Sequence, residues 1–297
     1  MKDLKLHQLK KSKDILLALK QYGVMSQKTL QKVVPDIKKE RNFRAYLKNL
    51  CAKNLVVKRL DQLNGFAGVF YQLNQKPKIR EILVQYLDCE ANELKQREFR
   101  YKELLHEQSA IKIAYYLNSN FPEAIVLRDF ELHRNIEAQK VIPNLNQVEQ
   151  PKPDVLMLIP DMSKRKIVSV AIEFERSAKE KNRILNKLKY YAADTHIDSV
   201  IYIATTDRII ENLSDVYESR VLEKAVRIKH YGRNFLLTGL WKNDVEKSFQ
   251  LLRNQNGIYY GLNDYVAKLR LNSARERSDV EFNVPSTVCM DKDKYDL

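Results

Sequence analysis

The stretch that decides the fold is PDVLMLIPDMSKRKIVSVAIEFE, which spans residues 153–175. Two apolar segments, PDVLMLIP and KIVSVAIEFE, flank the polar turn DMSKRK, and this pattern predicts two strands joined by a short connection. The first strand begins next to Asp154, and the second ends on Glu173-Phe174-Glu175. The stretch therefore combines buried-type strands with acidic residues at their ends.

The segments on either side extend this pair into a larger sheet. They predict a strand at 124–132, a helix at 178–194, a buried-type strand at 199–206 and a helix at 208–225. Weaker signals predict strand material at 226–240 and helices around 244–253 and at 262–271. Strands that alternate with helices in this way are typical of an α/β core. We expect residues 97–271 to form one α/β domain with a mixed sheet.

The acidic residues of the central stretch are candidates for a metal site. Antiparallel pairing of the two strands would bring Asp154 beside Glu173, and Glu175, two residues further on, would project from the same face as Glu173. Three converging carboxylates repel one another unless a cation lies between them, and hard divalent ions such as Mg²⁺ or Mn²⁺ take oxygen ligands. Such an ion can activate water and neutralise charge on a phosphate. The alternative is that these are ordinary carboxylates at strand ends, bridged to nearby lysines.

The N-terminal segment has a different pattern. Helical periodicity ends at Gly23, Ser26 is placed to cap a second short helix, and a third helix is predicted over 38–54. Two strand segments around Asn64-Gly65 then predict a β-hairpin. Three helices followed by a hairpin is the order of a winged helix-turn-helix, in which the third helix faces the DNA groove. Winged helices also serve as protein-contact modules.

Charge is distributed unevenly along the chain. The net charge is +14, and residues 1–76 hold 17 Lys and Arg against five acids, a net of +12. A basic N-terminal segment on a nearly neutral remainder favours nucleic-acid binding. The alternative is a lysine-rich solubilising surface. The candidate DNA-binding residues are those on the polar face of the third helix, namely Lys38, Lys39, Arg41, Arg44 and Lys48.

The predicted domain organisation follows from these segments. Residues 1–76 form a winged-helix DNA-binding domain, 77–96 a helical linker, 97–271 the α/β domain and 272–297 a polar tail whose composition allows disorder. The fold class is therefore α+β. The three Cys residues show no CxxC spacing, no apolar run is long enough to span a bilayer, and no secretory signal or P-loop motif is present. We expect a cytoplasmic protein without a membrane partner.

The strand pair resembles the PD-(D/E)xK nuclease superfamily. The resemblance is carried by Pro153-Asp154, by the pair Glu173 and Glu175 and by the helix that follows. It implies a restriction-endonuclease-like domain with a Mg²⁺ or Mn²⁺ cofactor. Glu175 stands where that superfamily usually has a lysine. Lys179, or less favourably Lys187, could supply the missing charge from the next helix.

A narrower likeness includes the wing GFAGVFYQLN, the pair His106-Glu107, PDVLML and AIEFERSAK…KLKYYAA. Together these resemble the replication-relaxation family, which includes MOBC-type plasmid relaxases. The resemblance implies metal-dependent nicking of double-stranded DNA at a plasmid origin region, and allows other mobilisation proteins as partners. It implies Glu107 as a further acidic metal ligand and His106 as a ligand or proton carrier.

Two rival functions remain open at this point. One is a non-catalytic DNA-binding regulator of replication or mobilisation with a degenerate nuclease fold, which the absent third-motif lysine favours. The other is a restriction-type endonuclease, which would cut both strands as a dimer. The pair Tyr190 and Tyr191 also suggests a covalent tyrosine–phosphate intermediate, although a helical Tyr pair more often serves packing.

Overall fold

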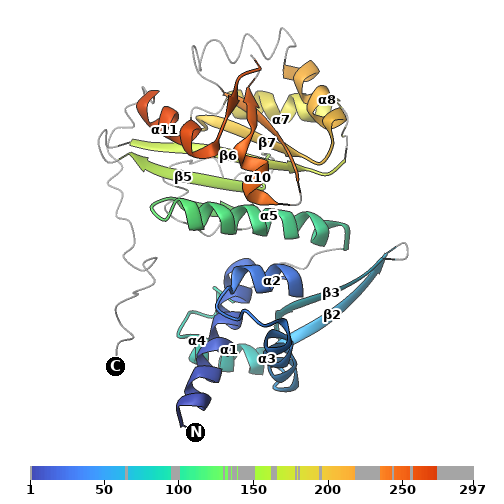
Figure 1. Ribbon diagram of the computed structural model, residues 1–297, viewed down its shortest axis with the longest axis vertical. Coiled ribbons are helices and arrows are strands. Elements are labelled where there is room, and N and C mark those ends of the chain that lie inside the picture. The colour runs from blue at the N-terminus through green and yellow to red at the C-terminus, as the bar shows by residue number, and fades with distance from the viewer. Residues whose placement is uncertain are drawn as a thin grey trace.

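The protein is an α+β structure with a three-stranded sheet and a seven-stranded mixed sheet, which confirms the predicted class and the mixed sheet (Figure 1). The computed structural model describes residues 2–63, 66–94, 101–129, 131–132, 135, 139, 151–161, 166–177, 179, 181–193, 196–217, 235–242, 244–254 and 257–272. The predicted tail after residue 272 lies outside the described residues.

The elements up to residue 73 form a unit that we call the head. They are α1 (Lys2–Tyr22), β1 (Met25–Ser26), α2 (Gln27–Val33), α3 (Glu40–Ala52), β2 (Val56–Leu63) and β3 (Phe66–Leu73). The strand order is β1-β3-β2, and all pairs are antiparallel. The predicted hairpin is confirmed in its strands, while its turn at Asn64-Gly65 lies outside the described residues.

Local sequence signals explain where the head's helices begin and end. Gly23 has φ +78°, a left-handed conformation that glycine adopts without strain, and its N–H bonds to the Leu19 carbonyl (2.9 Å), which ends α1. The Ser26 hydroxyl accepts a hydrogen bond from the Thr29 N–H (3.2 Å) and so caps α2, as predicted. On α3, Phe43 and Leu47 are buried on the face that the periodicity indicates.

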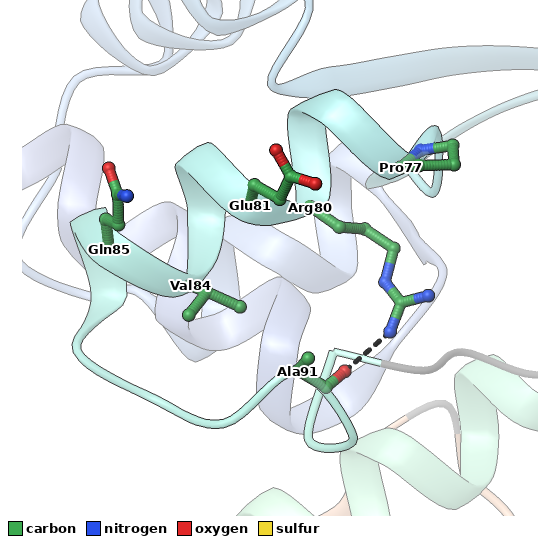
Figure 2. Close-up of a pocket in the computed structure, with 6 residues that line it drawn as sticks. All are labelled: Pro77, Arg80, Glu81, Val84, Gln85 and Ala91. Carbon is green, nitrogen blue, oxygen red and sulfur yellow. Dashed lines mark hydrogen bonds between the residues drawn. The ribbon is translucent and has the colours of Figure 1, made fainter.

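A short helix, α4 (Pro77–Leu87), follows the head and packs against α1. Arg80 donates a hydrogen bond to the Ala91 carbonyl (2.7 Å), which holds the chain after α4 back against the helix (Figure 2). A pocket of about 370 Å³ lies here, lined by Pro77, Arg80, Glu81, Val84, Gln85 and Ala91. None of the candidate site residues contributes to it. The domain boundaries at 76 and 97 stay predictions.

The remaining elements form a second unit that we call the body. They are α5 (Tyr101–Asn120), β4 (Ile125–Arg128), β5 (Val155–Asp161), β6 (Lys166–Glu175), α7 (Lys181–Ala193), β7 (Ser199–Ala204), α8 (Asp207–Tyr217), β8 (Leu236–Leu240), α10 (Val245–Gln250), β9 (Leu252–Asn254), β10 (Tyr259–Tyr260) and α11 (Leu262–Asn272). The sheet order is β10-β9-β8-β7-β6-β5-β4. β6, β7 and β8 are parallel to one another, whereas the other pairs are antiparallel.

Helices cover both faces of this sheet. One cluster of buried apolar side chains joins α7 and α8 to one face. The other cluster joins the head, α5, α10 and α11 to the opposite face, so that α5 lies between the head and the sheet (Figure 1). α5 contacts α2 and β2 on one side and β4, β5 and β6 on the other. Head and body therefore share a continuous apolar core.

Two predicted elements differ in extent from the observed ones. The strand predicted over 124–132 ends at Arg128. The chain turns there: the Glu131 side chain accepts a hydrogen bond from the Arg128 N–H (2.9 Å), and the Glu131 N–H donates one to the Arg128 carbonyl (2.9 Å). The helix predicted over 244–253 ends at Gln250, and Leu252–Asn254 instead joins the sheet as β9. The short strands β1, β9 and β10 were not predicted.

Across the parts of the chain that the structure describes, no helix combines the length and the apolar character that crossing a membrane requires.

Candidate functional site

The candidate site lies where β6 extends beyond its neighbour β5. The last register pair between the two strands is Val155 with Ile172, while β6 continues beside β7 as far as Glu175. The backbone of Phe174 therefore lacks a strand partner on the β5 side. Asp154 Oδ2 accepts from the Phe174 N–H (2.7 Å), and His106 Nε2 lies 2.9 Å from the Phe174 carbonyl oxygen. These two side chains take the place of the missing strand partner, so Asp154 and His106 lie together at one end of the sheet.

Glu173 is the most enclosed carboxylate of the candidate site. Its side chain lies on the sheet face covered by α7, and the residue is only 4% exposed. One carboxylate oxygen contacts Lys187 Nζ (2.5 Å), and the other accepts a hydrogen bond from the Tyr191 hydroxyl. Lys187 and Tyr191 are four residues apart on α7, so one face of that helix supplies both partners.

The electrostatics of the group follow from burial and from its charges. Burial and the charge of Asp154 raise the pKa of Glu173 to about 7, although Lys187 and Tyr191 act in the opposite direction. Burial alone would lower the pKa of Lys187, but Glu173 and Asp154 outweigh it and the pKa is raised. At neutral pH the lysine is charged and Glu173 lies close to its titration midpoint.

His106 carries a positive charge at neutral pH. Burial works against that charge, but the hydrogen bond and the carboxylate of Asp154 prevail and raise the pKa of His106 to about 9. In turn, although burial would raise the pKa of Asp154, its hydrogen bond with His106 lowers it. His106 Nε2 lies 3.2 Å from Asp154 Oδ2. The ring also packs on Phe174, which meets Trp241 edge to face (4.9 Å between centroids).

Glu175 has a partner of its own. Lys179 Nζ lies 2.7 Å from Glu175 Oε2, and the lysine side chain is 31% exposed, against 25% for Lys187. The sequence places Lys179 at the start of the following helix, but α7 begins only at Lys181. Lys179 thus acts from the connection before the helix, on Glu175 rather than on Glu173.

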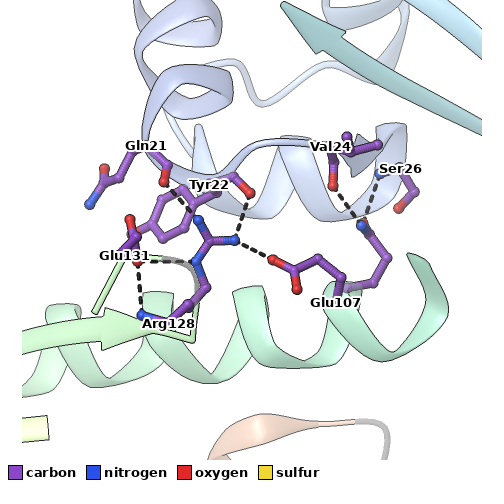
Figure 3. A network of polar contacts seen from close by, with 8 residues as sticks. Gln21, Tyr22, Val24, Ser26, Glu107, Arg128 and Glu131 are labelled. Carbon is purple, nitrogen blue, oxygen red and sulfur yellow. Dashed lines mark hydrogen bonds and ion pairs between the residues drawn. The ribbon is translucent and has the colours of Figure 1, made fainter. Parts of the chain in front are cut away.

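Glu107 lies apart from the other acidic candidates. It is buried and forms an ion pair with Arg128 (2.5 Å) on the side of α5 that faces the head (Figure 3). Neighbouring residues on a helix point about 100° apart, so His106 and Glu107 cannot both face one site. This helical spacing was a signal available in the sequence. The structure brings together Asp154, Glu173 and His106, with Glu175 nearby, and does not bring Glu107 to them.

The candidate DNA-binding residues occupy one exposed region of the head. Lys39 is the N-terminal flanking residue of α3, which begins at Glu40. The exposed basic side chains there are Lys38, Lys39, Arg41, Arg44 and Lys48. Arg44 pairs with Glu40 (2.5 Å), so part of its charge is compensated.

Two residues that contact Glu173 have smaller roles in the sequence analysis. It places Lys187 second to Lys179, and it offers Tyr191 only for packing or covalent chemistry. Tyr191 is 1% exposed and donates its hydroxyl proton to Glu173, and burial raises its pKa well above the ordinary value. A buried, protonated phenol of this kind is suited to orienting a carboxylate rather than to attacking a phosphate.

Comparisons with protein-family models, with curated proteins and with solved structures found no match to this chain. Within the described residues, no three or more His, Cys, Asp or Glu side chains are grouped so that they could hold a metal ion.

Proposed function

We propose that the protein is a DNA-processing enzyme that binds duplex DNA through its head and nicks one strand at the end of β6. The observation that carries the proposal is the juxtaposition of Asp154, Glu173 and Lys187. Two acids from paired strands and a lysine on the second acid form the combination that PD-(D/E)xK nucleases use, with the lysine supplied here from α7. The proposal extends to the replication-relaxation family and to plasmid origin DNA as substrate.

The arrangement of the head supports the DNA-binding part of the proposal. Three helices precede a long hairpin, and β1 between α1 and α2 adds a third strand. This is the arrangement expected of a winged helix-turn-helix, with α3 as recognition helix and the hairpin as wing. The exposed basic side chains at α3 can contact phosphates, which hold and orient the protein on a duplex.

The carboxylates present fit a divalent ion in part. Asp154 and Glu173 are oxygen donors, and the charge of Asp154 raises the pKa of Glu173, a repulsion that a cation would relieve. Mg²⁺ is commonly bound by one or two carboxylates together with substrate phosphates. Asp154 and Glu173 would hold the ion, with Glu175 next to them on the same face. When bound, such an ion activates water and neutralises phosphate charge.

The chain's own residues supply the remaining chemistry. Lys187 Nζ places a partly exposed positive charge next to Glu173, where it can also contact a phosphate oxygen of the substrate. His106, charged at neutral pH, contacts Asp154 and the Phe174 carbonyl through Nε2 and so holds that acid at the end of the strand. Tyr191 orients Glu173 through its hydroxyl.

Binding of Mn²⁺ is expected to strengthen as pH rises from about 6 to 8. The pKa of Glu173 is raised to about 7, so below this pH the ion must displace a proton from the carboxyl group. Because a group one unit below its pKa is about one-tenth ionised, affinity should rise roughly tenfold over this interval. Calorimetric titration with Mn²⁺ at pH 6 and at pH 8 measures the two affinities. Equal affinity at the two pH values would exclude Glu173 as a ligand that titrates near neutrality.

Replacing Arg41, Arg44 and Lys48 together by Gln in the full chain is expected to weaken duplex binding strongly. The slope of log K against log salt should flatten by about 0.9 for every phosphate that the variant no longer neutralises. Fluorescence anisotropy with a labelled duplex over a salt series measures both effects. Arg270→Gln is the matched control, since Arg270 pairs with Glu123 on the body. If the wild-type protein binds no duplex at low salt, the head binds a protein instead.

A non-catalytic regulator is the second candidate, and a specific observation favours it. Each acid near the site is already compensated by a cation of the chain: Glu173 by Lys187, Glu175 by Lys179 and Asp154 by His106. Incubation with supercoiled plasmid that carries its own origin, with and without Mn²⁺, separates the possibilities. Nicked circles support the nickase, linear product supports a restriction-type enzyme, and unchanged plasmid with intact binding supports the regulator.

A further inference from the structure

Three consecutive residues of α5 connect the candidate site to the head. His106 contacts Asp154 and the Phe174 carbonyl in the body. Glu107 pairs with Arg128 beneath the head, and Gln108 bonds to the head directly, accepting from the Ser26 N–H and donating to the Val24 carbonyl, both 2.8 Å (Figure 3). One helix therefore holds a contact with the candidate site and a contact with the head two residues apart.

Arg128, at the end of β4, caps a helix of the head. Its guanidinium donates to the carbonyls of Gln21 (2.9 Å) and Tyr22 (2.7 Å), which are the last two residues of α1. The last carbonyls of a helix have no partner within the helix and carry partial negative charge. The same guanidinium lies 5.6 Å from the centre of the Tyr22 ring. A cation of the body thus completes the C-terminus of a head helix.

Burial makes this arrangement specific. Arg128 is 1% exposed and Glu107 is 6% exposed. Besides the two carbonyls, the guanidinium contacts Glu107 (2.5 Å) and Glu131 (3.3 Å). A buried charge is tolerated only when its hydrogen bonds are made with good geometry, and removing one partner is strongly unfavourable. All of these contacts depend on the observed placement of the head on the body.

We infer that Glu107 and Arg128 are positioning residues that fix the head on the body, and thereby fix the distance from the DNA held by α3 to the acids at the end of β6. The part concerning DNA rests on the proposed function. Glu107 then acts through the head–body interface and not as a metal ligand.

The fixing of the head is tested without DNA, by hydrogen exchange and calorimetry on the full chain. The variants are Arg128→Met, Glu107→Gln and both together. We expect amide exchange around Ser26 to rise about a hundredfold or more in Arg128→Met, which leaves the Glu107 carboxylate buried without its cation. The rise should be smaller in Glu107→Gln, because the Gln amide oxygen can still accept a hydrogen bond from Arg128. In calorimetry, the double variant should lose less free energy of unfolding than the two single variants lose together. Protection in β5, β6 and β7 should persist.

Control variants separate this role from general destabilisation. Arg270→Met and Glu123→Gln break an Arg–Glu pair within the body and should leave exchange around Ser26 unchanged. Arg128→Lys keeps the positive charge but loses the planar guanidinium that donates several hydrogen bonds at once. Amide protection around Ser26 should therefore lie between that of Arg128→Met and that of the wild type. If exchange around Ser26 stays at the wild-type rate in both single variants, or if the body strands lose protection equally, the inference is overturned.

A second experiment, with DNA, measures the position of the nick. The wild-type protein should nick at one position relative to its bound sequence, whereas Arg128→Met should bind with similar affinity but scatter the nicks over several nucleotides. A simple loss of stability would reduce all nicks without moving them, and that result would overturn the positioning role. If the wild type does not nick at all, the proposed enzyme function fails, while the exchange measurements still decide whether the head is fixed.

Discussion

Replacing Asp154 by Asn is expected to abolish metal-dependent nicking of supercoiled plasmid, with a loss of rate of about 10³-fold or more. Asn keeps an oxygen that can accept the Phe174 N–H, so the strand end stays capped, but it removes the negative charge that a divalent ion requires. Duplex binding should be unchanged, because the head is untouched. Agarose gel assays of nicked product and anisotropy with a labelled duplex measure the two quantities.

A second readout of Asp154→Asn does not depend on activity. His106 has a pKa of about 9 because of Asp154, so in the variant this pKa should fall towards or below the ordinary histidine value, which an NMR titration of the imidazole follows. Asp198→Asn is the matched control: Asp198 is buried, accepts from the Ser169 N–H (2.9 Å) on the same strand, and lies away from the candidate residues. Nicking at the wild-type rate by Asp154→Asn would place the active site elsewhere.

Replacing Lys187 by Met should lower the nicking rate by about 10²–10³-fold, the usual effect of losing a charge positioned on a reacting phosphate. Without Lys187 the buried carboxylate of Glu173 also loses the cation that opposes its raised pKa. Lys187→Met should therefore shift the onset of activity to higher pH. Single-turnover rates from pH 6 to pH 9 at one fixed, subsaturating concentration of Mn²⁺ measure both changes.

Two further variants and a folding measurement show whether the loss of rate is specific to Lys187. Lys179→Met removes the partner of Glu175 and should have the smaller effect, since Lys179 does not contact Glu173. Lys181 lies on α7, like Lys187, and forms an exposed ion pair with Asp215 of α8, so Lys181→Met should leave the rate unchanged. Thermal unfolding shows whether each variant is folded. A larger loss in Lys179→Met than in Lys187→Met would contradict the assignment and restore the order that the sequence suggests.

Much of the local structure was predictable because it depends on neighbours in the chain. Ser26 and Gly23 act on backbone groups within a few residues, so their effects as cap and terminator are written in the local sequence. The alternation of apolar segments and turns predicted β5 and β6 almost to their observed ends. The strand predicted after residue 124 was too long because its end is decided by the Glu131 side chain, an interaction that periodicity does not report.

The partners of the candidate site residues were less predictable. From the sequence, Lys179 is closer to the acids than Lys187, and in the structure it does bind the nearer one, Glu175. Whether Lys187 reaches Glu173 depends on how α7 crosses the sheet, which is set by the packing of its apolar face on β6 and β7. Sequence distance measures the length of chain between two residues, whereas their meeting in space depends on the direction in which each element runs.

The sequence by itself determined the α+β class, the order of the longer helices and strands, the basic head and the acids at the ends of two buried strands, because composition, periodicity and turn residues act locally. Only the tertiary structure decided which charges meet. It paired Glu173 with Lys187, turned Glu107 away to Arg128 and placed α5 between head and sheet. Ion pairs between distant segments form only after the apolar faces have packed, since that packing sets the separation of every pair of side chains.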